Sequence, residues 1–174
     1  MRRMLMLFAA VALLALSLAP VVQAQDGKGK GPVDAGGAPT PVEPDNPPFT
    51  ITEEQFPGAC SFPVAFEPTG KEKRIELPNG TLLITSPGLD VTLTNTEPGG
   101  TSETFNVTGA VRVLPPDEEG IQVTEVTGRN LLIDPDAGFV VAIGNFSFAF
   151  DEEGNLVQPL EGEGQLIDVC EALA

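Results

Sequence analysis

Apolar and polar residues alternate along most of the chain, and the longest alternating stretch runs from 138 to 157. Within it Phe146, Phe148 and Phe150 are separated by small residues. Because side chains on a strand point to alternate faces, the three rings share one face and the small residues share the other. The pattern predicts a strand that faces the core of the protein. We interpret the whole stretch as part of the structural scaffold.

A second apolar row lies just upstream, at Phe139, Val141 and Ile143, with the opposite parity. The two rows can share one face only if an extra residue is inserted between them. Gly144 stands at this join, followed by an asparagine, and both residue types tolerate the positive φ found in a β-bulge. We therefore predict one long, bent strand with a bulge near Gly144, followed by a hairpin turn at 151–155.

Strand-like runs separated by turn motifs rich in Pro, Gly, Asn and Asp fill the rest of this region. They are 62–66, 75–77, 82–84, 89–93, 104–113, 121–123 and 165–169, which makes about eight strands with the long one. Short connections and the lack of a helical period predict an all-β antiparallel meander. A coiled central strand favours a small closed or nearly closed β-barrel, and a Greek-key β-sandwich is the alternative.

The chain divides into three segments. Residues 1–24 have two arginines, an apolar run and the small-residue ending Val22-Gln23-Ala24, which predicts a secretory signal peptide cleaved near Ala24. Residues 25–48 are rich in Gly and Pro without periodic apolar positions, which predicts a disordered linker. Residues 49–174 form the β-domain. We expect a secreted, extracellular protein with no membrane span after cleavage.

The only two cysteines, Cys60 and Cys170, lie near the two ends of the β-domain. Export to an oxidising compartment makes a disulfide the first interpretation of this pair. A reactive thiol pair is the alternative, but the two residues lack the close spacing of a redox motif. The bridge would fasten the end of the domain to its first strand.

The chain contains no His, Trp or Tyr. Catalytic arrangements that need histidine are therefore excluded, as are imidazole zinc sites, and no serine has the surroundings of a known nucleophile. Paired carboxylates remain, and Glu125 shares its parity with Ile121 and Val123, which would aim it inward as a general acid. We favour the alternative that Glu125 faces solvent, since glutamate is rarely buried unpaired. We predict no enzymatic activity and no catalytic residue.

The chain carries 25 acidic and 9 basic residues, and cleavage of the signal removes Arg2 and Arg3, leaving a net charge of −18. Such a charge disfavours nucleic acid and anionic membranes as partners. The Asp-x-Asp-x-Gly motif at 134–138 begins like a calcium loop but lacks the later ligands, so we interpret it as a turn. We expect no metal and no cofactor.

Five short segments, PNGT at 78–81, SPGL at 86–89, NVTG at 106–109, GRNLL at 128–132 and DVC at 168–170, occur in one domain. Together they resemble a group of small exported bacterial β-domain proteins with no assigned function. The resemblance covers nearly the whole domain and implies the fold. It implies no activity and no catalytic residue.

Two function hypotheses of different classes follow. The first is an extracellular, monomeric binding or interaction module that engages a protein or cell-wall component through loops at one end, with Gly128-Arg129-Asn130 as a candidate contact. The second is a carrier of a small apolar ligand held inside the barrel. A carboxylate-dependent hydrolase that uses Glu125 is a third and weaker hypothesis.

Overall fold

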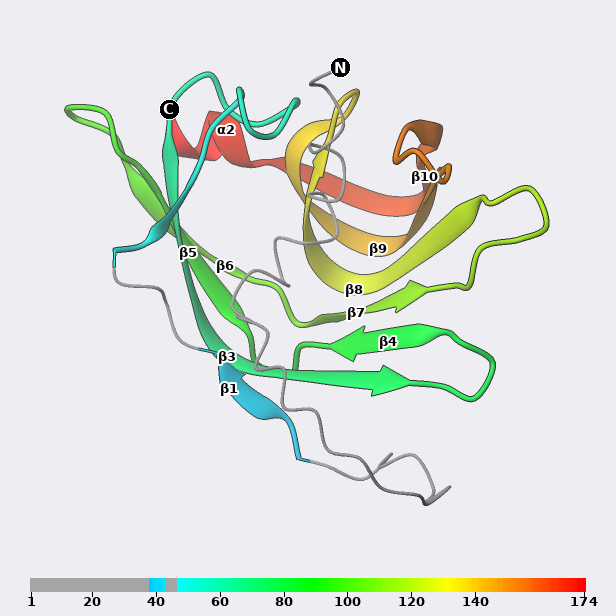
Figure 1. Ribbon diagram of the computed structural model, residues 1–174. Coiled ribbons are helices and arrows are strands. Elements are labelled where there is room, and N and C mark those ends of the chain that lie inside the picture. Colours follow the sequence, from blue (N-terminus) through cyan, green and yellow to red (C-terminus); the bar gives the residue numbers. More distant parts are fainter. Residues whose placement is uncertain (1–37, 43–46) are drawn as a thin grey trace.

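The computed structural model describes residues 38–42 and 47–174 (Figure 1). The predicted signal peptide and most of the predicted linker lie outside these residues. The described elements are β1 (Thr40–Val42), β2 (Phe49–Ile51), β3 (Val64–Glu76), β4 (Leu82–Thr85), β5 (Asp90–Asn95), β6 (Ser102–Asn106), β7 (Gly109–Val113), β8 (Gln122–Asp134), β9 (Gly138–Phe150), β10 (Leu156–Asp168) and the helix α2 (Val169–Leu173). The first strand lies within the segment predicted as linker, yet it pairs with β3.

All pairs are antiparallel, and the sheet order is β10-β9-β8-β7-β4-β3-β5-β6, with β1 and β2 also on β3. The order is that of a meander in which two successive positions are each occupied by two short strands instead of one long strand. The strands β4 and β5 lie one after the other along β3, and β6 and β7 lie one after the other along them. The antiparallel all-β prediction is therefore confirmed.

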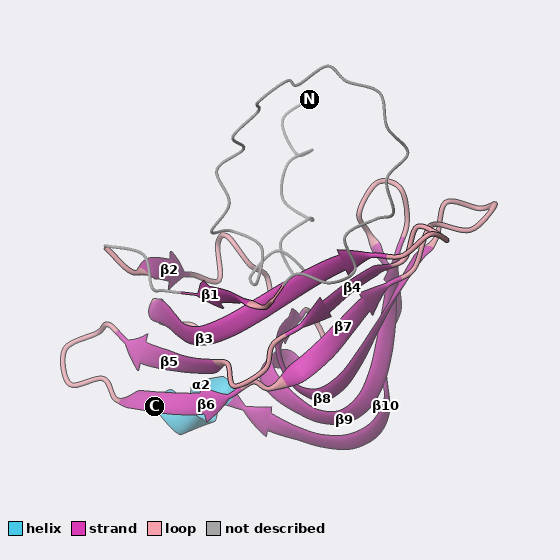
Figure 2. Cartoon of the chain, turned by 90° about the horizontal axis from the view of Figure 1, so that it is seen from below, coloured by secondary structure: helices cyan, strands magenta, loops and turns pink. Residues whose placement is uncertain are grey.

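The sheet does not close into a barrel. In the described part of the chain β10 and β6 stand at the two ends of the strand order and do not pair with each other. Full closure, one of the two forms of barrel predicted from the sequence, is therefore wrong, and an open meander or the sandwich alternative fits the sheet. The sheet instead curls over so that β3 and β5 lie across from the β8–β9 hairpin, and two hydrophobic cores form (Figures 1 and 2).

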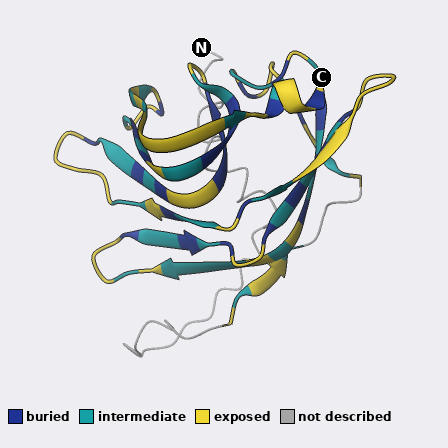
Figure 3. Ribbon diagram, turned by 180° about the vertical axis from the view of Figure 1, so that it is seen from behind, coloured by how far each residue is buried: buried dark blue, intermediate teal, exposed yellow. Residues whose placement is uncertain are grey.

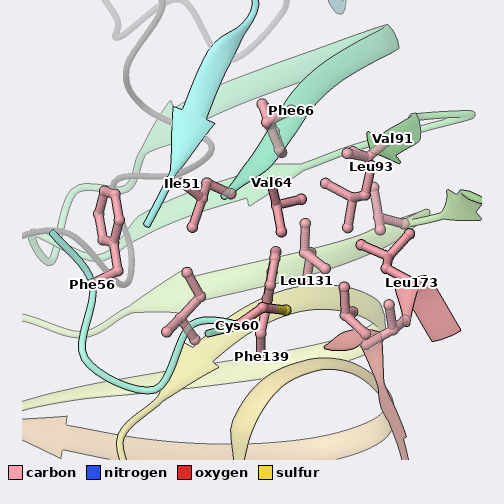
Figure 4. Close-up of a cluster of buried hydrophobic side chains, with 14 of the residues drawn as sticks. Ile51, Phe56, Cys60, Val64, Phe66, Val91, Leu93, Leu131, Phe139 and Leu173 are labelled. Carbon is pink, nitrogen blue, oxygen red and sulfur yellow. The ribbon is translucent and has the colours of Figure 1, made fainter. Parts of the chain in front are cut away.

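The first core fills the space between β3, β5, the β8–β9 hairpin and α2 (Figure 4). Its buried side chains are Ile51, Phe56, Cys60, Val64, Phe66, Leu89, Val91, Leu93, Val107, Leu131, Ile133, Phe139, Val141, Val169 and Leu173. Most come from alternate positions of their strands, as expected when one face of each strand is buried.

The second core lies on the opposite face of the same β8–β9 hairpin. Its buried side chains are Ile84, Val111, Val126, Leu132, Val140, Ala142, Phe146 and Phe148. Both faces of this hairpin are therefore buried near its turn, which explains why residues 139–142 are apolar at every position rather than at every second one.

The bulge predicted near Gly144 is absent from β9. Every residue of β8 from Gln122 to Asp134 pairs with one residue of β9 without a register shift. The two phenylalanine rows need no inserted residue, because they belong to different cores on opposite faces: Phe139 packs in the first, and Phe146 in the second. Register shifts occur instead in β10.

Glycines replace the bulge as the means of bending the sheet. Four of them stand in one row across adjacent strands, Gly109 opposite Gly128, Gly128 opposite Gly144, and Gly144 opposite Gly164. Gly144 has φ of 144°, and a Cβ there would overlap the backbone carbonyl of Glu163. The row permits close approach of backbones where β8, β9 and β10 curve strongly in Figure 1.

The C-terminal helix closes the first core and is held in place covalently. Cys60 and Cys170 form the disulfide predicted from the sequence, with Cα atoms 5.3 Å apart. Val169 and Leu173 of α2 are fully buried, and the side-chain amide of Asn95 donates to the Leu173 carbonyl at 3.2 Å. Among the described residues no helix is long and apolar enough to cross a membrane.

Candidate functional site

Glu125 lies on the outer face of β8. Its carboxylate accepts a hydrogen bond from Arg112 Nη1 at 2.9 Å, and its side chain is 39% exposed. The positions of β8 that face inward here are Thr124 and Val126, not those that share the parity of Glu125. The inward orientation considered from the sequence is therefore wrong, and the outward alternative is correct.

Gly128, Arg129 and Asn130 do not form an exposed loop. They lie inside β8, at the glycine row, so the loop contact considered from the sequence is wrong. Asn130 is buried, and its side-chain amide donates to the Thr127 carbonyl at 3.0 Å. Gly128 and the Arg129 side chain are exposed, whereas Asn130 is not, so the segment belongs to a strand of the bent sheet.

The acidic motif at 134–138 is the turn between β8 and β9. The Asp134 carboxylate is buried and accepts hydrogen bonds from the backbone amides of Asp136 (2.9 Å) and Ala137 (2.7 Å). These bonds fix a turn in which the carboxylate is directed at its own backbone. No group of three metal-binding side chains occurs among the described residues.

Within residues 38–42 and 47–174, the strand β6 forms an edge of the sheet and pairs only with β5. The backbone amide of Val107 donates to the Leu89 carbonyl and that of Asn95 to the Thr101 carbonyl, both at 2.9 Å. Since hydrogen-bonded pairs alternate along antiparallel strands, the odd-numbered residues of β6 use their backbone groups toward β5. The amides and carbonyls of Ser102, Thr104 and Asn106 therefore point away from the sheet.

Side chains of β6 lie on two different faces. On the outer face Thr104 Oγ1 lies 2.9 Å from Thr92 Oγ1, and the side-chain amide of Asn106 donates to Asp90 at 2.9 Å. On the other face Glu103 is exposed, and Phe105 is half-buried against the first core. The polar pairs and the apolar anchor hold β6 straight and regular against β5.

The strand β10 at the opposite end of the sheet is also an edge, but it is poorly suited to strand pairing. It contains Pro159, and its register shifts twice, between Leu156 and Gln158 and between Gln158 and Glu161. Glu161 and Glu163 are exposed along it. Proline, bulges and charges are the devices by which sheet edges avoid pairing with other chains. The regular edge β6 contains neither proline nor a register shift.

Figure 3 shows the β5–β6 hairpin with exposed residues along β6. Ser102, Glu103 and Thr104 are all exposed, so this part of β6 is open to solvent, although α2 lies near the strand. The sequence predicts one strand at 104–113, whereas the structure divides this stretch into β6 and β7. Sequence reasoning could not identify β6 as an edge, because the order of strands in a sheet depends on pairings that no local pattern encodes.

A shallow apolar pocket opens at the end of the second core, where β8, β9 and β10 meet. Its volume is about 270 Å³ with the open mouth included, and it is lined by Leu132, Ile133, Asp134, Pro135, Phe148, Phe150, Leu156 and Leu160. The enclosed part holds about one water molecule. A larger ligand would have to displace the half-buried side chains of Phe150, Leu156 and Leu160.

Comparison with known proteins found no match: no family model, no curated protein and no solved structure is similar to this chain. The resemblance to small exported bacterial β-domain proteins stays a prediction from the sequence. The function has to be argued from the geometry of the chain.

Proposed function

We propose that this protein is an exported, non-enzymatic interaction module that binds an extended segment of a partner protein as an added strand along β6. The observation that carries the proposal is the regular, exposed edge at which Ser102, Thr104 and Asn106 direct their backbone groups outward. An extended peptide gains affinity from main-chain hydrogen bonds to such an edge, and specificity from side chains on alternate positions.

The expected extracellular location of the protein fits a binding role. The predicted signal peptide supports secretion, and the Cys60–Cys170 disulfide is compatible with an oxidising extracellular compartment. The surface ion pair of Glu125 with Arg112 supports a non-enzymatic role, because an exposed, paired carboxylate is a poor general acid. We propose a monomer that joins its partner by this one edge.

A proline at the centre of β6 tests the proposal. Because the Thr104 amide points away from β5, Thr104→Pro removes an outward donor and no bond of the native ladder. Peptides selected from a random displayed library on the disulfide-bonded protein should bind Thr104→Pro at least about tenfold more weakly, as measured by titration calorimetry.

The matched control is Thr104→Ala, which loses the hydroxyl contact with Thr92 but keeps the outward amide. It should bind the selected peptides nearly as well as the original protein. Circular dichroism and the melting temperature establish that both variants fold. Equal binding by the proline variant, or a library that yields no binder, would overturn the proposal.

A second candidate function is the carriage of a small apolar ligand at the pocket lined by Phe148, Phe150 and Leu160, which requires displacement of the half-buried Phe150 and Leu160 side chains. The chain contains no Trp, so Leu160→Trp both fills the pocket and introduces a fluorescent reporter. Native mass spectrometry of the protein from its culture medium should show a ligand mass that Leu160→Trp abolishes. A bare chain in both samples would exclude this candidate.

A further inference from the structure

Three segments beside β6 carry acidic but no basic side chains, and Arg129 lies near the end of β6, where its backbone amide donates to the Thr108 carbonyl at 3.2 Å. Residues 64–69 of β3, the β5–β6 hairpin at 90–106 and the C-terminal segment 168–174 contain six carboxylates and no lysine or arginine. The six are Glu67, Asp90, Glu97, Glu103, Asp168 and Glu171. The helix α2 contacts both β5 and β6, and Figure 2 shows it beside β6, so all three segments belong to one region.

The register of an added strand follows from the outward backbone groups. An antiparallel strand hydrogen-bonded to Thr104 places one residue opposite Thr104, the next residue opposite Glu103 and the preceding residue opposite Phe105. The residue opposite Glu103 and the one opposite Phe105 lie on the same face, next to the first core. The residue opposite Thr104 lies on the outer face with Thr92.

These positions favour particular side chains. Opposite charges directly across a strand pair stabilise it, whereas like charges destabilise it, so Glu103 favours lysine or arginine and disfavours a carboxylate. Phe105 is half-buried at the margin of the first core and favours an apolar or β-branched neighbour. Thr104 favours a small β-branched residue in the added strand, because its neighbour across the β5–β6 pair, Thr92, is also small and β-branched.

We propose that the segment recognised by β6 is cationic, with an apolar residue, a β-branched residue and a lysine or arginine in that order along an antiparallel strand. This inference rests on the proposed function, because it assigns the chemistry of the strand that β6 binds. Opposite charge raises the association rate and excludes acidic segments. A second copy of this chain is disfavoured as occupant, since it would place the same carboxylates against one another.

Three capped peptides of one design test the proposal. The first is Thr-Lys-Thr-Val-Thr-Lys-Thr-Lys-Thr, and in the other two glutamine or glutamate replaces each lysine. By titration calorimetry at low salt the lysine peptide should bind about tenfold tighter than the glutamine peptide, and the glutamate peptide should not bind. Raising the salt concentration should weaken the lysine peptide most, because exposed charges are screened.

Two charge variants locate the effect. Glu103→Gln should weaken the lysine peptide by about two- to fivefold and leave the glutamine peptide unchanged, since one cross-strand ion pair is lost. Glu161→Gln makes the same change of charge on β10, the other edge, and should leave both peptides unchanged. Thr104→Pro should abolish binding of both peptides.

The outcomes separate this inference from the proposed function. If the glutamine peptide binds as tightly as the lysine peptide and Thr104→Pro abolishes both, the cationic partner is refuted while strand addition at β6 stands. If no peptide binds at β6, both are refuted. A dimer that forms without peptide and disappears in Thr104→Pro would make a second copy the occupant and overturn the inference.

Discussion

The two cores share the β8–β9 hairpin but differ in how they are closed. The first core is covered by β3 and β5, sealed by α2 and fastened by the disulfide between Cys60 and Cys170. The second core lies in the curl of the sheet and ends at half-buried side chains around the apolar pocket. We therefore expect substitutions in the first core to cost more free energy of unfolding than substitutions at the open end of the second core.

Removal of the disulfide should have the largest effect. The bridge spans a sequence separation of 110 residues, and closing a loop of that length stabilises a protein by about 4 to 5 kcal/mol on the chain-entropy model. The double variant Cys60→Ser and Cys170→Ser should lose most of this free energy of unfolding in urea denaturation. An unchanged denaturation midpoint would mean that packing alone holds α2 on the first core.

Truncation of one ring in each core compares them directly. Phe139 is 1% exposed in the first core, and Phe139→Ala should cost about 3 to 5 kcal/mol through lost burial and a cavity. Phe150 is half-buried at the open end of the second core, and Phe150→Ala should cost about 1 to 2 kcal/mol. Urea denaturation of the two variants measures both losses, and equal values would contradict the difference between the cores.

The sequence was sufficient for the parts of the fold that depend on local pattern. Alternation identified most of the strands, but the run predicted at 104–113 is two strands, β6 and β7, and β1 and β2 lie outside the predicted runs. Two cysteines in a predicted exported chain identified the disulfide. The opposite parity of Phe139 and Phe146 predicts a bulge only if both rows face one core, and the structure has two cores and no bulge in β9. Two cores on opposite faces of one hairpin arise from long-range curling, which no window of sequence contains.

The site was harder to predict than the fold. Parity with Ile121 and Val123 would aim Glu125 inward, but the rarity of unpaired buried glutamate favours the outward orientation that the structure shows. Thr124 and Val126 face the core instead. The free edge at β6 depends on which strand stands last in the sheet. The edge has no signal of its own in the sequence, since it follows from contacts between distant residues.

Substitution of Gly144 tests whether the glycine row produces the curl that encloses the second core. Gly144→Ala places a Cβ against the Glu163 carbonyl at a φ that side chains rarely adopt, and should cost about 1 to 3 kcal/mol. Amide hydrogen exchange should accelerate in β10, which pairs with β9 at this point.

Gly99 provides the control for this substitution. It has φ of 89° in the β5–β6 turn, and a Cβ there would meet nothing within 4 Å. Gly99→Ala therefore carries the backbone strain without the overlap, and its loss should be smaller than that of Gly144→Ala. Equal losses would show that conformational strain rather than close approach makes glycine necessary in the row.

The smallest expected effect on stability concerns Asp151, in the turn between β9 and β10 at the edge of the second core. Hydrogen bonds from the Asn155 side chain (2.8 Å) and backbone (2.7 Å) hold the pKa of the Asp151 carboxyl below its ordinary value. Because the pKa is lower in the folded state, the ionised carboxylate stabilises the turn above the pKa of the unfolded chain. This stabilisation is lost as the pH falls through the folded pKa.

Asn155→Ala removes the largest cause of that shift, so the pKa of Asp151 should rise toward its ordinary value. An NMR titration of the Asp151 side-chain carboxyl measures the change. The effect should stay within the turn, because the first core lies on the other face of the hairpin and has no part in these bonds. A titration in which resonances of Leu173 or Phe139 follow Asp151 would contradict the independence of the two cores.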